Sequence, residues 1–204
     1  MRTAWLAGVL LVGLWAVAEE LPAPWEAQDI GGRSHGTATL TEGLLTVTTA
    51  SGDVWGTADS FRFVYQRLSG DGEIRAKVTR LDKSNDWAKA GVMIRAGLEP
   101  GAAHAFCCVT PEFGICLQHR PSQGAESDTT EPSQRPHQAP YWVKLVRRGD
   151  TFTASCAARE LDWEQVEELH LTMPAEVLIG VAVASHDERQ ATTAEFDHLT
   201  LKRR

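Results

Sequence analysis

HAFCCVTPEFGICLQHR, residues 104–120, predicts a β-hairpin with two chemically different faces. Its turn is the PEFG segment, residues 111–114, since proline and glycine are typical turn residues. Side chains alternate across a strand, so pairing about this turn places Cys108 opposite Cys116. One face is then almost wholly apolar and requires a core: Ala105, Cys107, Val109, Ile115 and Leu117. The other face offers an imidazole, a ring, an amide and a guanidinium: His104, Phe106, Gln118 and Arg120.

The rest of the chain shows the same short-strand pattern. Short apolar runs are separated by turn signals, and helical periodicity is almost absent, which is typical of an all-β sandwich or barrel of about twelve strands. Sequential strands joined by short turns usually pair with their neighbours. We therefore expect one antiparallel meander, made of residues 88–95, 104–110, 115–120, 141–147 and 151–156.

The side chains of this meander that point away from the core should converge on one concave, solvent-facing surface. They are Lys89, Met93, Arg95, His104, Phe106, Gln118, Arg120, Trp142 and Lys144, with Trp87 at the rim. Aromatic rings can stack on sugars while amides and charged groups bond their hydroxyls, so this set is a candidate carbohydrate site. Its surplus of lysine and arginine favours an anionic polysaccharide. The alternative is a solvated sheet face whose long side chains merely cover the strands.

The N-terminus has the pattern of a signal peptide. Arg2 precedes the apolar residues 4–17, and Ala16-Val17-Ala18 supplies a small-x-small cleavage site. We expect a signal peptide over residues 1–18, one domain over 19–204, and a secreted or periplasmic (extracytoplasmic) location. The apolar run is shorter than the ~20 residues that span a bilayer, and no later hydrophobic span follows, so no membrane span is expected after signal removal. A retained anchor is the alternative.

The net charge bears on the binding partner, and the cysteines bear on disulfide formation. The formal net charge of −7 disfavours nucleic acid, which needs a basic footprint. Four cysteines in an exported chain suggest disulfides, and Cys108 and Cys116 could be bridged if they face one another. Cys107 reads as a small core residue. The pairing of Cys107, Cys108, Cys116 and Cys156 stays open.

Several stretches resemble a known family. They are SGDVWGTADSFRF (51–63), GDGEI (70–74), WAKAGVMIR (87–95), APYWVKL (139–145) and AEFD (194–197). The chain is similar in them to a bacterial concanavalin A-like lectin/glucanase superfamily domain of unknown function, the regulation-of-enolase-like family. The resemblance implies a jelly-roll sandwich of two antiparallel sheets, and it brings no agreed catalytic set.

The sequence thus predicts an exported, non-catalytic carbohydrate-binding module without a cofactor. One alternative is a glycoside hydrolase or lyase that uses the carboxylates of Glu160, Asp162 and Glu164, although the resemblance places that segment at a hairpin turn. Another is a cell-envelope protein-interaction module that uses the polar loop 120–140. The histidines lack zinc spacing. A structural calcium could lie between Asp29 and Asp197 if the terminal strands pair and backbone carbonyls complete the site.

Overall fold

The described part of the chain consists of β-strands and the loops that connect them. The computed structural model describes residues 21–32, 34–129, 138–160 and 162–204. These residues contain fourteen strands and no helix, and hence no helix that could span a membrane. The expected signal peptide, residues 1–18, lies outside the described residues.

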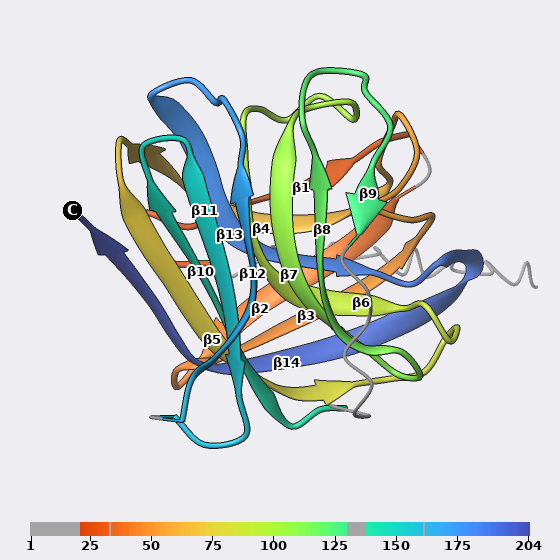
Figure 1. The fold of residues 1–204 in the computed structure, drawn as a ribbon. Coiled ribbons are helices and arrows are strands. Elements are labelled where there is room, and N and C mark those ends of the chain that lie inside the picture. The colour runs from red at the N-terminus through yellow and green to blue at the C-terminus, as the bar shows by residue number, and fades with distance from the viewer. Residues whose placement is uncertain (1–20, 33, 130–137, 161) are drawn as a thin grey trace, which may run out of the picture.

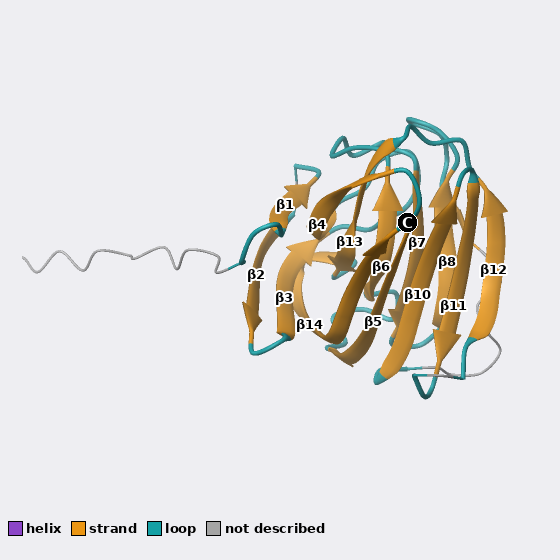
Figure 2. Ribbon diagram, turned by 90° about the vertical axis from the view of Figure 1, so that its left-hand side faces the viewer, coloured by secondary structure: helices purple, strands orange, loops and turns teal. Residues whose placement is uncertain are grey.

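The strands form two antiparallel sheets that face one another (Figure 1; Figure 2). The first sheet has the order β1 (Glu26–Ile30), β4 (Phe61–Ser69), β13 (Glu176–Ala184), β6 (Lys89–Arg95), β7 (His104–Thr110), β8 (Gly114–Arg120) and β9 (Asp128–Thr129). The second sheet has the order β12 (Glu164–His170), β11 (Thr151–Ala157), β10 (Tyr141–Arg148), β5 (Gly72–Leu81), β14 (Asp187–Arg203), β3 (Leu44–Ser51) and β2 (His35–Thr41). The prediction of an all-β jelly-roll sandwich is confirmed.

The main core lies between the sheets, where the inward side chains of both meet. On β5 the period-2 alternation places Ile74, Ala76 and Val78 in this core. The hairpin has the predicted register, with His104 opposite Arg120 and Cys108 opposite Cys116. Its apolar face is part of the core, as predicted: Ala105, Cys107, Val109, Ile115 and Leu117.

A second apolar cluster covers the outer face of the first sheet. Its members come from β1, β4, β6, β7, β8 and β13 and from the loop before β4, and they include Val54, Phe61, Phe63, Met93, Phe106, Cys108 and Cys116. Burial of these side chains removes apolar area from water and fastens the loop to the sheet. Much of this outer face is therefore covered rather than open to solvent.

The predicted five-strand meander is wrong after its third strand. Strands β6, β7 and β8 pair in sequence, but β10 pairs with β5 and β11 in the second sheet. Residues 121–140 separate β8 from β10, which is too many for a tight turn, and β10 lies in the second sheet. Trp142 and Lys144 consequently lie on the second sheet, where both contact Trp163: the two indole centroids are 6.3 Å apart, and Lys144 Nζ lies 4.1 Å from the Trp163 ring.

Gly91 on β6 is a position where only glycine fits the sheet. A Cβ there would lie 2.1 Å from the carbonyl oxygen of Cys107 and 2.6 Å from the Cα of Cys108. We predict that Gly91→Ala lowers the free energy of unfolding by about 1–3 kcal/mol, the usual cost of overpacking. Urea unfolding measures this. Gly32→Ala is the control, because a Cβ at Gly32 meets nothing within 4 Å; equal effects of the two substitutions would contradict the prediction.

Candidate functional site

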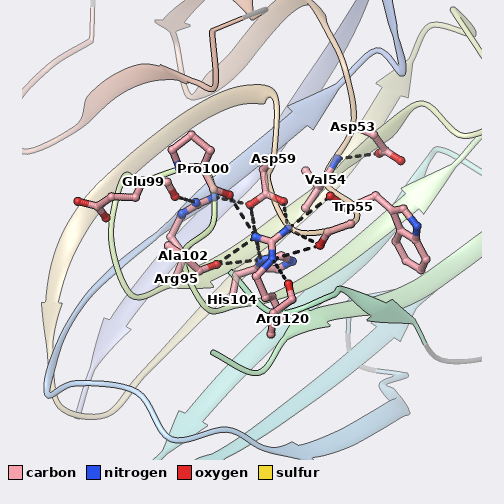
Figure 3. A network of polar contacts seen from close by, with 12 residues as sticks. Asp53, Val54, Trp55, Asp59, Arg95, Glu99, Pro100, Ala102, His104 and Arg120 are labelled. Atoms are coloured by element: carbon pink, nitrogen blue, oxygen red, sulfur yellow. Dashed lines mark hydrogen bonds and ion pairs between the residues drawn. The ribbon is translucent and has the colours of Figure 1, made fainter. Parts of the chain in front are cut away.

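Three buried charges meet where the ends of β6 and β8 lie under the loop between β3 and β4 (Figure 3). Asp59 in this loop receives two hydrogen bonds from Arg120, Nη2 to Oδ1 at 2.6 Å and Nη1 to Oδ2 at 2.8 Å. Arg95 Nη1 lies 3.3 Å from Asp59 Oδ2. All three side chains are 0% exposed. The prediction that Arg95, His104 and Arg120 share one face of the first sheet is correct, since His104 on β7 is paired with Arg95 on β6 and with Arg120 on β8.

The remaining guanidinium hydrogens bind backbone carbonyls of the loops around them. Arg95 donates to the carbonyl oxygens of Gly97 and Glu99 at 2.6 and 2.7 Å. Arg120 donates to carbonyl oxygens in three different loops, those of Gly56, Pro100, Ala102 and Ala125. The two arginines therefore hold the loops 52–60, 96–103 and 121–127 on the sheet.

The electrostatics of this cluster follow from its burial. Burial raises the pKa of Asp59, and the hydrogen bonds and charge of Arg120 with the charge of Arg95 oppose that rise. The two guanidinium groups that donate to the carboxylate favour its ionised form. Burial lowers the pKa of Arg95 to about 10. Burial and the two neighbouring guanidinium groups hold the pKa of His104 well below its usual value, so its ring is neutral.

Arg95, His104 and Arg120 were predicted to face solvent, and this placement is wrong. The loop that carries Asp59 covers them, and it satisfies the guanidinium groups internally. Phe106 and Met93 are also fully buried, in the second apolar cluster. The predicted positively charged surface is therefore not present on this face, because its arginines pair with a buried carboxylate.

A pocket of about 410 Å³ opens on the same side of the first sheet. It brings together three of the predicted site residues, Trp87, Lys89 and Gln118, with four that the sequence analysis did not select. Those four are Asp53, Trp55, Thr129 and His186. Trp55 is 43% exposed, and Trp87 stacks on Phe113 with ring centroids 3.9 Å apart. We call this the tryptophan pocket.

The sequence held a signal for part of this pocket. Asp53 and Trp55 lie in the glycine-containing stretch 51–63 that carried the family resemblance. Binding residues are disproportionately found on loops that a rigid scaffold holds in place. Thr129 and His186 gave no comparable signal, because only the folded chain brings them to β8 and β6.

Asp53 joins two of the polar groups of the tryptophan pocket. The ammonium group of Lys89 donates to Asp53 Oδ1 and to the carbonyl oxygen of Trp87, and His186 Nδ1 lies 3.0 Å from Asp53 Oδ2. Burial alone would raise the pKa of Asp53, but the hydrogen bond with His186 and the charge of Lys89 hold it below its usual value. The buried Lys89 charge is thus neutralised within the pocket.

Gln118 supplies an unpaired acceptor to the pocket. Its side chain is 1% exposed, and its Oε1 has no hydrogen-bond partner among the described residues. A buried unpaired oxygen costs free energy, and a ligand that donates a hydrogen bond would remove that cost.

The residues of the two other candidate sites, for calcium and for glycoside hydrolysis, do not come together in the predicted arrangement. Asp29 lies on β1 and Asp197 on β14, and these strands pair with β4 and with β3 and β5, so the strand pairing on which a calcium site between them depended does not occur. The described residues hold no group of three metal-ligating side chains. Glu160 and Asp162 lie in the turn before β12, where Glu160 pairs with Arg75 at 3.1 Å, so the three carboxylates do not share a strand face.

Removing the charge of Asp59 should be costly. Asp59→Asn leaves two buried guanidinium groups without their counter-charge, and we predict a loss of about 3–5 kcal/mol in the free energy of unfolding. Asp82→Asn is the matched control, because the Arg80–Asp82 pair is exposed to solvent and its removal should change stability far less. Urea unfolding of both variants tests this, and a loss below 1 kcal/mol for Asp59→Asn would contradict it.

The neutral His104 predicts a pH dependence of stability. Below about pH 6.5 the unfolded chain binds a proton on this residue and the native chain does not. Stability should therefore fall as the pH drops below that value, by up to about 1.4 kcal/mol per pH unit for one such group. Burial also lowers the pKa of His119, which adds to the slope. Urea unfolding between pH 7.5 and 5.5 should give a shallower slope for His104→Asn; an unchanged slope would refute the assignment.

Comparison with known proteins supports the fold. No protein-family model matches the chain, and no curated protein matches it, so membership of the regulation-of-enolase-like family stays a prediction. Among solved structures, a functionally unknown protein from Saccharomyces cerevisiae is similar with a TM-score of 0.65 at 14% identity, covering 84% of this chain and 97% of that chain.

Two further solved structures carry descriptive names. A carbohydrate-binding module from Bacillus subtilis is similar with a TM-score of 0.58 at 17% identity, covering 86% of this chain and 94% of that one. Lectin II from Ulex europaeus is similar with a TM-score of 0.54 at 11% identity, covering 91% and 99%. At these identities the likeness shows the fold alone, which is a concanavalin A-like jelly-roll sandwich of two antiparallel sheets.

Proposed function

We propose that the chain is an exported, non-catalytic carbohydrate-binding module whose ligand occupies the tryptophan pocket. The observation that carries this proposal is the unpaired Oε1 of Gln118, buried in a pocket whose walls include two indoles. An aromatic face stacks on the C–H side of a sugar ring, and a buried acceptor takes a hydrogen bond from a sugar hydroxyl. The pocket's size of about 410 Å³ lies within the range of small-ligand sites.

The charges of the pocket favour a neutral sugar over the anionic polysaccharide that the sequence suggested. Lys89 is neutralised by Asp53, and Arg95 and Arg120 are occupied by Asp59 and by loop carbonyls. An anionic group would bring further acceptors against Gln118 Oε1 and the Asp53 carboxylate. A neutral hydroxyl-rich ligand supplies the donors that these oxygens need.

Two further facts support binding and export. The fold is shared with proteins named as a carbohydrate-binding module and a lectin. The apolar N-terminal residues 4–17 and the Ala16-Val17-Ala18 site fit removal by a signal peptidase, and this supports a secreted or periplasmic location.

Two substitutions test the pocket, with one control. Trp55→Ala and Gln118→Leu should each weaken binding about tenfold or more, which corresponds to the loss of about 1.4 kcal/mol. Leu44→Ala is the control, since Leu44 is an exposed large apolar side chain on the second sheet, outside the pocket. Affinity electrophoresis in gels that contain neutral or anionic polysaccharides, after a glycan-array screen, measures the effect.

The wild-type chain should be retarded in a neutral polysaccharide gel, and the Leu44→Ala variant should be retarded equally. Binding that survives both pocket substitutions would contradict the site. Absence of binding across the array would contradict the function. Reducing-sugar release that requires Glu160 would contradict the non-catalytic assignment in favour of a hydrolase.

A further inference from the structure

Cys108 and Cys116 form a pair of facing thiols on the outer side of the first sheet. They are directly opposed in the β7–β8 register, and their sulfur atoms are 3.5 Å apart. Both are free thiols in the structure and both are buried. Residues opposed in antiparallel strands have Cα atoms about 4.5–5.5 Å apart, a separation within the range that disulfides bridge. Small side-chain rotations would thus bring the two sulfurs to bonding distance.

The other two cysteines provide an internal contrast. Cys107 neighbours Cys108 in sequence but points into the core between the sheets. It faces the second sheet, where its thiol contacts the carbonyl oxygen of Ser155 at 3.9 Å. Cys156 belongs to the second sheet. Neither of these two thiols has a cysteine partner opposite it within its own sheet.

The facing thiols adjoin residues that line the tryptophan pocket. Cys116 precedes Gln118 by two residues on β8, so both side chains point to the same face. Cys108 is opposite Gly91, which follows Lys89 by two residues on β6. The hydroxyl of Thr129, another residue that lines the pocket, forms a hydrogen bond with Cys116. In the strand register the pair therefore lies between Lys89 and Gln118, two residues that line the pocket.

The two sulfurs differ in their electrostatic environment. The hydrogen bond with Cys108, opposed by burial and aided by Thr129 and the charge of Lys89, lowers the pKa of Cys116. Burial raises the pKa of Cys108 well above its usual value. Since the thiolate is the nucleophile, Cys116 is the sulfur that reacts first with an oxidant.

We propose that Cys108 and Cys116 are a reversible oxidation site, which hydrogen peroxide entering through the tryptophan pocket converts to a disulfide. The Cys116 thiolate attacks one peroxide oxygen, the O–O bond breaks, and a sulfenic acid and hydroxide are formed. The Cys108 thiol then attacks the sulfenic sulfur, the S–O bond breaks, and water leaves with the thiol proton. One peroxide is reduced to two waters overall, once the hydroxide takes up a proton. A small thiol restores the pair by disulfide exchange.

Peptide mass spectrometry tests this on the native wild-type chain. The protein is treated with hydrogen peroxide, denatured, and its remaining thiols are blocked with N-ethylmaleimide. Cleavage after Glu112 separates the peptide of Cys107 and Cys108 from that of Cys116. We expect the two peptides to be joined by a bond that dithiothreitol reverses, with two hydrogens lost and with Cys156 blocked by maleimide.

The Cys107→Ala variant distinguishes the two cysteines of the first peptide. It should form the bond as the wild type does, whereas Cys108→Ala and Cys116→Ala should not. Two blocked thiols at Cys108 and Cys116 after peroxide treatment would overturn the proposal. So would a bond between Cys107 and Cys156, or a bond that forms only when the chain is already unfolded in urea.

Discussion

The buried pair of Asp59 and Arg120 is the interaction on which the outer side of the first sheet depends. Apolar contacts between the two sheets form the core of the sandwich itself. The loops above the first sheet contribute few side chains to the second apolar cluster, chiefly Val54 and the partly buried Leu98, and they are also held by carbonyl hydrogen bonds to Arg95 and Arg120. Burial of those guanidinium groups requires the Asp59 carboxylate, which neutralises one of their two charges. It also requires oxygen acceptors for their remaining N–H groups.

The tryptophan pocket is a consequence of this arrangement. The loop 52–60 contributes Asp53 and Trp55 to the pocket and Asp59 to the buried pair, so the ion pair fixes where the indole of Trp55 stands. Lys89 is a second buried cation on this sheet, and it is paired with the carboxylate of Asp53. The charged groups of Lys89, Arg95 and Arg120, which were predicted to contact a ligand, therefore hold the loops around the pocket. Gln118 Oε1 remains an unpaired acceptor among the described residues.

Local pattern accounts for what could be predicted from the sequence. The register of β7 and β8 follows from one tight turn and a period of two, and it is correct to the residue. The pattern could not predict that β10 joins the second sheet, since the long connection before it carries no pairing signal. Nor could it predict the cover over Arg95 and Arg120, because Asp59 lies 36 and 61 residues away from them in sequence.

Hydrogen exchange of the Asp59→Asn variant tests the central claim most directly. Three backbone bonds connect the loops to one another: Asp59 N–H to Pro100, Gly124 N–H to Gly101, and Ser127 N–H to Gly56. If one ion pair holds all three loops, these amides should lose protection together while amides of β10 and β11 keep theirs. Loss of protection at Asp59 alone, with Gly124 and Ser127 as protected as in the wild type, would contradict the account.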